Sequence, residues 1–408
     1  MKTTRVMPAL LSPAGNMERL QTALRFGADA VYVGAQSMSL RSFADNFSFE
    51  ALCAACDMAH ARGAKVYVAC NAFARDADLT QLPALFKQAA DAGADALIVN
   101  DPGVIRMARR ALPDMPLHLS TQANTLNAEA AAFWHEQGIR RIVLARELTL
   151  DEIKALRAHT PETLELEMFV HGAMCISYSG RCLLSNYLDG RDSNRGACVQ
   201  PCRWAYEMRE KGGDGGYATI EQDEKGSFVL NARDLNLIRY LDRILDAGIC
   251  SLKIEGRMKS VAYVATVTNA YRMALDAVLR GEAPEEYVYA ELEKASHRPY
   301  WTGFALGNPG IDGQANQSAQ YITDMDVCAV VLDYDAAKER AFIEQRNRFF
   351  DGDTLSILSP GDVRRAFTVQ GIWTEDGQTR HSAPHPKQRL YLGCKSAVRA
   401  GDILRISK

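Results

Sequence analysis

The chain has 408 residues, of which 47% are apolar and 24% charged, so it can bury a large core and should divide into about two globular units. Its formal net charge of -3 gives no overall attraction for nucleic acid, so an anionic partner must be recognised by a local patch. Since no segment approaches the roughly 20 apolar residues that span a bilayer and the N-terminus lacks a signal-peptide pattern, we expect a cytoplasmic protein without a membrane partner.

Eight short apolar runs, typical of buried strands, recur through the first two thirds of the sequence. They begin at Ala9, Ala30, Lys65, Ala96, Leu117, Arg141, Leu166 and Ser251. Helix-like stretches with apolar residues at helical spacing lie between them. Because the runs are apolar throughout, they predict a parallel sheet buried on both faces, and eight repeats favour a closed (β/α)8 TIM-like barrel. A doubly wound open sheet is the alternative.

An insertion interrupts the repeat before the last strand. The seventh and eighth runs begin at residues 166 and 251, which are 251 − 166 = 85 residues apart, whereas the other spacings suit single βα units. The inserted residues, about 173–226, are rich in Cys, Arg, Gly and Ser, and residues 212–227 read as a loop or hairpin tip. A helix over residues 230–248 is expected to resume the barrel.

The C-terminal part of the chain changes to short strands separated by turn residues. We therefore predict a barrel domain over residues 1–290, a linker over 291–318, and a small β-barrel domain over 319–408. Small β-modules of this kind often bind nucleic acid or another protein, so the tail is a candidate RNA-binding domain.

Four of the ten cysteines fall within the insertion, at Cys175, Cys182, Cys198 and Cys202. Thiolates are soft ligands that suit zinc or iron–sulfur clusters, and an irregular segment can wrap four of them around one centre. Structural zinc sites are typically built from pairs of cysteines two to four residues apart, and only the last two cysteines fit that spacing. The spacing alone therefore indicates a soft-metal centre, either an iron–sulfur cluster or zinc.

Polar side chains follow most of the predicted strands. In a barrel, these C-terminal strand ends form one rim, where ligands bind. Lys253, Glu255 and Arg257 alternate along the chain and should share one face, which makes them site candidates. His171 is a candidate acid or base, although a buried structural histidine is an equal alternative. Further candidates for the rim are Asn71, Gln122 and Glu147.

Arginines and aromatic residues accompany the cysteines, among them Arg181 and Tyr178. Cations beside stackable rings suit an anionic aromatic substrate or unpaired nucleotides. Alternatively, the arginines neutralise a thiolate cluster and the rings pack around it. No hydrolase, ATPase or dinucleotide-binding motif stands out.

Three stretches carry a resemblance to a known family: LLSPAGNMERLQTALRFGADAVYVG, EMFVHGAMCISYSGRCLLSNYLDGRDSNRGACVQPCRW and SLKIEGRMKS. Together with the β-rich tail, they resemble the collagenase-like peptidase family U32 across nearly the whole chain. The resemblance implies a 4Fe-4S cluster with Cys175, Cys182, Cys198 and Cys202 as ligands. For the branch with this tail, it implies prephenate-dependent hydroxylation of the wobble uridine of tRNA to 5-hydroxyuridine.

The leading hypothesis is therefore a tRNA hydroxylase that takes prephenate as a small anionic co-substrate. In it, Arg181, Lys253 and Arg257 contact anions, while His171 and Glu255 assist proton transfer. The remaining substrate-binding candidates are Gln122, Asn71, Glu147 and Tyr178. Three alternatives stay open: a peptidase of unknown catalytic type, a non-catalytic RNA-binding accessory protein, and a hydroxylase of ribosomal RNA or quinone precursors. A partner protein or a second copy of the chain is also open.

Overall fold

The computed structural model describes residues 7–34, 46–195, 197–204, 232–308, 313 and 321–408. Its contacts divide the chain into two compact units. The first comprises Met1–Leu24, Ala28–Lys259 and His297–Tyr321, and the second comprises Arg25–Gly27, Ser260–Ser296 and Ile322–Lys408. The predicted hairpin tip at 212–227 lies outside the described residues, as do residues 309–312 and 314–318 of the predicted linker.

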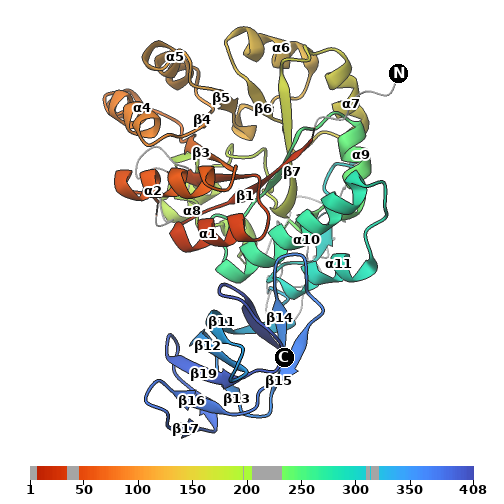
Figure 1. Cartoon of the computed structure of the whole chain (residues 1–408). Coiled ribbons are helices and arrows are strands. Elements are labelled where there is room, and N and C mark those ends of the chain that lie inside the picture. The colour runs from red at the N-terminus through yellow and green to blue at the C-terminus, as the bar shows by residue number, and fades with distance from the viewer. Residues whose placement is uncertain (1–6, 35–45, 196, 205–231, 309–312, 314–320) are drawn as a thin grey trace, which may run out of the picture. The chain divides into compact units, whose positions relative to one another are not determined.

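The first unit contains a closed barrel of eight parallel strands, which confirms the predicted fold (Figure 1). Its strands are β1 (Ala9–Pro13), β2 (Ala30–Gly34), β3 (Lys65–Cys70), β4 (Ala96–Val99), β5 (Leu117–Leu119), β6 (Arg141–Val143), β7 (Glu165–Ala173) and β9 (Ser251–Ile254). Each strand pairs in parallel with the next, and β7 closes the ring on β9 with Glu167 opposite Ser251 and Phe169 opposite Lys253. The open-sheet alternative is thereby excluded.

Helices lie around these strands in Figure 1. They are α1 (Met17–Arg25), α2 (Phe49–His60), α3 (Asp76–Leu79), α4 (Leu82–Asp91), α5 (Pro102–Ala111), α6 (Ala128–Glu136), α7 (Leu150–Ala158) and α9 (Leu241–Asp246). Their starts follow from the sequence, since Asp101 accepts a hydrogen bond from the Val104 amide at 3.0 Å and Thr149 forms a capping box with Glu152. Short 3₁₀ turns, η1 (Thr121–Ala123) and η4 (Ile238–Tyr240), complete this part.

The helix expected over residues 230–248 is only partly correct. Its α-helical part is α9, whereas β8 (Asp234–Asn236) pairs antiparallel with β7 and also pairs with β10 (Tyr300–Trp301). A buried ion pair between Asp234 and Arg298 holds this arrangement, and Arg298 also donates its amide to the same carboxylate. The tertiary partner of Asp234 lies 64 residues away, so local helical spacing could not reveal it.

The described part of the insertion forms short turns. They are α8 (Leu184–Asp189), η2 (Ser193–Arg195) and η3 (Pro201–Arg203). Among the described residues, no helix has the length and apolar character needed to cross a bilayer.

The second unit combines helices with a β-rich tail, as predicted for the tail. Helical elements are α10 (Val261–Leu279), α11 (Glu286–Ala290) and η5 (Glu291–Lys294). Strands are β11 (Met325–Asp335), β12 (Arg340–Gln345), β13 (Phe349–Phe350), β14 (Thr354–Leu358), β15 (Ala366–Thr368), β16 (Ile372–Thr374), β17 (Thr379–Arg380), β18 (Ser382–Ala383), β19 (Arg389–Gly393) and β20 (Ile403–Ser407). Eight of them form an antiparallel sheet, ordered β15-β14-β20-β11-β12-β19-β16-β17, over an apolar core. A buried Arg405–Glu291 ion pair of 2.5 Å ties η5 to β20.

Candidate active site

A cavity of about 390 Å³ opens at the C-terminal ends of the barrel strands. Its wall includes residues that end or follow β2, β3, β5, β6, β7 and β9, together with the four cysteines of the insertion. This is the rim where barrel folds bind ligands, and its volume suits a small organic molecule. The cavity is therefore the candidate active site.

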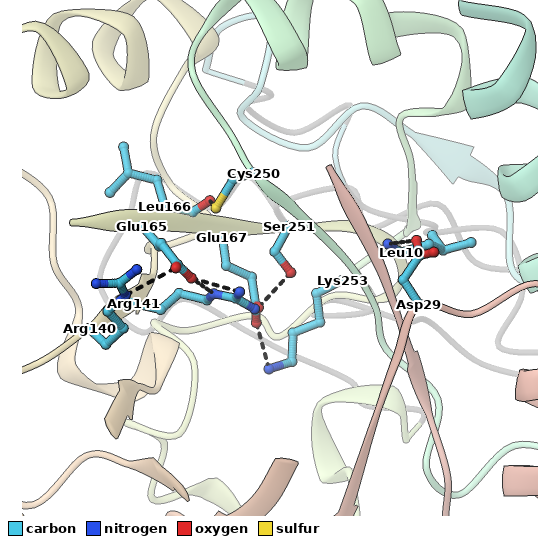
Figure 2. Close-up of polar contacts among 10 residues, drawn as sticks. All are labelled: Leu10, Asp29, Arg140, Arg141, Glu165, Leu166, Glu167, Cys250, Ser251 and Lys253. Carbon is cyan, nitrogen blue, oxygen red and sulfur yellow. Dashed lines mark hydrogen bonds and ion pairs between the residues drawn. The ribbon is translucent and has the colours of Figure 1, made fainter. Parts of the chain in front are cut away.

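Lys253 lines the cavity and belongs to a buried charge network inside the barrel (Figure 2). Its Nζ donates to the Glu167 carboxylate at 2.9 Å, and the same carboxylate accepts from Ser251 Oγ at 2.7 Å and from Arg141 at 3.2 Å. Burial would raise the pKa of Glu167, but Lys253 and Arg141 outweigh it and lower the pKa to about 2. The ionised Glu167 carboxylate thus holds the Lys253 ammonium in place at the cavity wall.

The network crosses the barrel interior. Arg141 on β6 lies 5.4 Å from the ring centroid of Tyr67 on β3, and the Tyr67 ring stacks edge-on against His118 on β5 at 4.6 Å. Tyr67 lies on β3, which neighbours neither β5 nor β6 in the sheet, so these side chains meet inside the ring. Burial lowers the pKa of His118 well below its ordinary value, and the Arg141 charge adds to that effect. His118 is therefore neutral beside the paired charges.

A chain of polar side chains forms another part of the wall. Asn71 Nδ2 donates to Ser120 Oγ at 3.3 Å, and Ser120 Oγ donates to Gln122 Oε1 at 3.1 Å. Gln122 is 2% exposed, and its Nε2 has no hydrogen-bond partner among the described residues. A buried donor without an acceptor costs free energy, so this amide is suited to a ligand that supplies an oxygen.

Arg146 is a cavity residue that the sequence analysis did not select. Its guanidinium lies 3.9 Å from the centroid of the Phe169 ring and donates to the Ala173 carbonyl at 2.8 Å. Burial lowers its pKa, while the nearby Glu255 carboxylate opposes that shift. Its Nε is buried without a partner in the described part of the chain, which gives the wall a second unfilled donor. The sequence signal for Arg146 was its position three residues after the end of β6 and one residue before the selected Glu147.

All four cysteines of the insertion line the cavity. Cys175 is exposed and the other three are half-buried. Burial raises the pKa of the Cys202 thiol, and the three other thiols raise it further while Arg203 lowers it. The Gln200 amide also donates to Cys198 Sγ at 3.3 Å, as amides commonly do to metal-bound thiolates.

The donor set fits an iron–sulfur cluster. Four soft thiols face one cavity, with Arg203 and a backbone amide available to offset thiolate charge. The four thiols are therefore candidate ligands of a soft-metal centre. In the described part of the chain, no group of three or more cysteine, histidine or carboxylate side chains is arranged to bind one metal ion.

The structure brings Lys253, Glu255 and Arg257 together at the cavity wall. Lys253 and Arg257 are both 4% exposed. The loop after β1 packs tightly here, because a Cβ at Gly15 would lie only 2.1 Å from the Arg257 carbonyl oxygen. The SPAGN sequence after β1 therefore needs glycine for this close approach.

His171 is not among the residues that line the cavity. It is 1% exposed, its Nε2 lies 3.5 Å from the Tyr300 hydroxyl, and Tyr300 stacks on His297 at 4.1 Å. Burial lowers the pKa of His171 to about 3, so the ring is neutral near pH 7. This environment matches the structural alternative better than an acid or base in the cavity.

Three other selected residues also lie outside the cavity wall: Glu147, Tyr178 and Arg181. Glu147 is half-buried, and burial raises its pKa. Tyr178 is 46% exposed on the insertion. Arg181 donates through Nε and a terminal nitrogen to the Gln122 carbonyl at 3.3 and 3.2 Å, which joins the cysteine segment to the barrel.

Gly180 lies at the same junction between the cysteine segment and the barrel. It adopts φ +73°, and a Cβ there would meet the Gln122 side chain at 2.8 Å. We expect Gly180→Ala to lower the free energy of unfolding by about 2 kcal/mol, combining backbone strain with this clash. Gly190→Ala is the matched control, because Gly190 has φ +66° but no atom within 4 Å of the added Cβ. Urea denaturation should show a clearly smaller loss for the control; equal losses would argue against the Gln122 contact.

Comparison with protein families identifies the chain. Residues 15–315 match the model of peptidase family U32, and residues 323–405 match the peptidase family U32 C-terminal domain. The chain belongs to peptidase family U32. This U32 protein is 40% identical over 406 residues to "tRNA hydroxylation protein P1" of Bacillus subtilis strain 168, across 98% of this chain and 95% of that one.

Two further relatives bear different names. The U32 protein is 34% identical to "tRNA hydroxylation protein P" of Escherichia coli K12, across 94% of this chain and 93% of that one. It is 32% identical to "Collagenase" of Porphyromonas gingivalis W83, across 73% of each chain. The family therefore includes both RNA-hydroxylation and protease names.

Proposed function

We propose that this protein is a cytoplasmic enzyme that hydroxylates the wobble uridine of tRNA to 5-hydroxyuridine, with prephenate as co-substrate and a 4Fe-4S cluster as cofactor. The observation that carries the proposal is a single cavity whose wall contains four thiols together with Lys253, Arg146 and Gln122. The names of the Bacillus subtilis and Escherichia coli relatives support tRNA hydroxylation.

Cys175, Cys182, Cys198 and Cys202 would hold the cluster, which supplies a redox centre or Lewis acid when bound. The chain itself contributes the surroundings. The Gln200 amide and Arg203 offset negative charge on the sulfurs, and the half-buried position of three of the cysteines limits their contact with water.

The cavity suits a small anion with two carboxylates, as prephenate is. Lys253 and Arg257 supply buried cations at the wall, and Glu167 fixes the position of the Lys253 ammonium. Gln122 Nε2 and Arg146 Nε are buried donors without an acceptor among the described residues. A carboxylate that accepts from such donors gains more than it would in water, because the donors need not be desolvated on binding. Glu255 is the carboxylate at the wall available to hold or pass a proton.

The peptidase alternative finds little support in the same cavity. No histidine lines it among the described residues, so neither its serines nor its cysteines have the imidazole base of a hydrolytic nucleophile. Ser120, the most buried of those serines, donates its hydroxyl to Gln122 rather than to a base.

A nucleoside profile tests the proposal directly. Transfer RNA from a deletion strain should lack 5-hydroxyuridine and its derivatives, and the wild-type gene should restore them. Cys182→Ser should fail to restore them, whereas Arg62→Gln, an exposed arginine outside the cavity, should restore them fully. An unchanged profile in the deletion strain, with any related gene also removed, would contradict tRNA hydroxylation. Restoration by Cys182→Ser would favour an accessory role for the segment.

A further inference from the structure

A second groove, of about 410 Å³, lies beside the cysteine segment. Its walls include Phe73, Arg75, Arg181, Leu183, Asp192 and Arg195, and we call it the arginine groove. Gly180 lines both the arginine groove and the active-site cavity, so the two hollows are neighbours on the same rim. A single-stranded polymer can therefore lie in the arginine groove while one of its units enters the active-site cavity.

The groove carries positive charge that its carboxylates do not balance. Arg195 is fully engaged by Asp78, which it contacts at 2.5 and 2.9 Å, and this contact lowers the pKa of Asp78 to about 2. Arg181 contacts only the Gln122 carbonyl and the face of Phe73, at 5.3 Å from the ring centroid, and has no carboxylate partner among the described residues. Its charge is therefore available to an anion.

Arg75 supplies a second cation that can exchange partners. Its side chain is 74% exposed, and its contact with Asp192 is long, at 3.4 Å. An exposed ion pair of this kind contributes little free energy, so a phosphate can compete for the guanidinium at small cost. Two arginine forks in one groove match the spaced phosphates of a nucleic-acid backbone.

Exposed apolar side chains stand next to the arginine groove. Leu183, which lines it, is 69% exposed. Tyr187 on α8 is 84% exposed and lies one helical turn after Leu183, to whose carbonyl its amide donates at 2.9 Å. Exposing a tyrosine ring to water gives no folding benefit, whereas a ring beside cations is a surface on which an unpaired base can stack.

We infer that the arginine groove binds the sugar-phosphate backbone of an unpaired RNA strand, with Tyr187 stacking on one of its bases, while the neighbouring nucleotide enters the cavity. This inference rests on the proposed function and adds to it the surface that grips the substrate. The contacts are to phosphates and ring faces, so the groove should bind unpaired strands with little sequence preference.

The test is binding and turnover of tRNA by the full-length protein with its cluster. Arg75→Gln and Tyr187→Ser are the variants. The contact of Arg75 with Asp192 is long and its side chain is exposed, and Tyr187 is 84% exposed, whereas Arg181 joins the segment to the barrel through two hydrogen bonds. Each should raise the Kd and KM for tRNA roughly ten-fold and leave kcat and the visible absorption unchanged. Arg75→Gln should also reduce the salt dependence of log Kd by about one unit of slope. Arg62→Gln, at an exposed position two residues after the end of α2, is the control and should match wild type.

The outcomes separate this inference from the proposed function. If wild type hydroxylates tRNA and the two variants keep its KM, Kd and salt slope, the inference is wrong and the proposed function stands. If wild type neither binds nor hydroxylates tRNA, both are wrong. Equal weakening by Arg62→Gln would reveal general electrostatic attraction instead of a groove.

Discussion

Replacing Glu167 with glutamine is expected to lower the free energy of unfolding by about 3 kcal/mol at pH 7. The change leaves Lys253 and Arg141 buried inside the barrel with no compensating charge on the residue that both contact. Far-UV circular dichroism in a urea titration measures the loss. Because Lys253 also loses its anchor at the cavity wall, co-substrate binding should weaken in the same variant.

Glu165→Gln is the matched control for this experiment. Glu165 also contacts Arg141, but its side chain is 28% exposed and lies at the solvent side of the same network (Figure 2). Water screens such a pair, so the control should lose less than about 1 kcal/mol. Equal losses in the two variants would contradict the claim that Glu167 is the central counter-charge.

Lowering the pH is expected to remove the stabilisation that Glu167 supplies. The pKa of Glu167 lies at about 2 in the folded chain, against an ordinary value of 4.5. Its stabilisation is therefore complete above pH 4.5 and is lost as the pH falls towards 2, because the unfolded chain binds the proton first. The difference in unfolding free energy between wild type and Glu167→Gln should shrink when measured at pH 3.5 instead of pH 7.

Replacing any one of Cys175, Cys182, Cys198 or Cys202 with serine is expected to abolish or strongly deplete the cluster. Anaerobically purified wild type should be brown and contain about four irons and four sulfides per chain, as a 4Fe-4S cluster requires. Each serine variant should lose most of the absorption and the iron together, because all four thiols line one cavity.

Cys250→Ser is the matched control. Its thiol donates to the Leu166 carbonyl at 3.3 Å and does not line the cavity, so iron and absorption should stay at wild-type levels. A colourless wild-type protein that holds one zinc would contradict the cluster. Retention of full iron by Cys202→Ser alone would show that three cysteines suffice and that the fourth ligand comes from elsewhere.

The barrel could be predicted because its strands are apolar at nearly every position. The run from Ala30 to Gly34 is buried throughout, and such a run is stable only between two covered faces. The rim position of Lys253, Glu255 and Arg257 also followed from sequence, since the C-terminal ends of parallel strands meet by construction. The regular recurrence of apolar strand runs in the sequence therefore predicted where the cavity lies.

The network inside the barrel and the role of Arg181 could not be found in this way. Glu167 occupies a strand position that reads as part of an apolar run. Two of its partners, Ser251 and Lys253, lie on β9, which only barrel closure brings beside β7. Arg181 was expected to contact an anion. The structure places its guanidinium outside the active-site cavity and over Phe73, a residue 108 positions earlier (181 − 73). Partners that are distant in sequence decide where charged side chains point.

The pairing of β7 with β9 has a consequence for how the chain folds. These strands are joined edge to edge although Glu167 and Ser251 are 84 residues apart, so the ring shuts only after the whole insertion has been made. Loop closure over that distance is entropically costly and slow compared with forming local βα units. The Glu167–Lys253 ion pair joins these same two strands. We therefore expect the barrel to close and its central charges to lose their water in the same late step of folding.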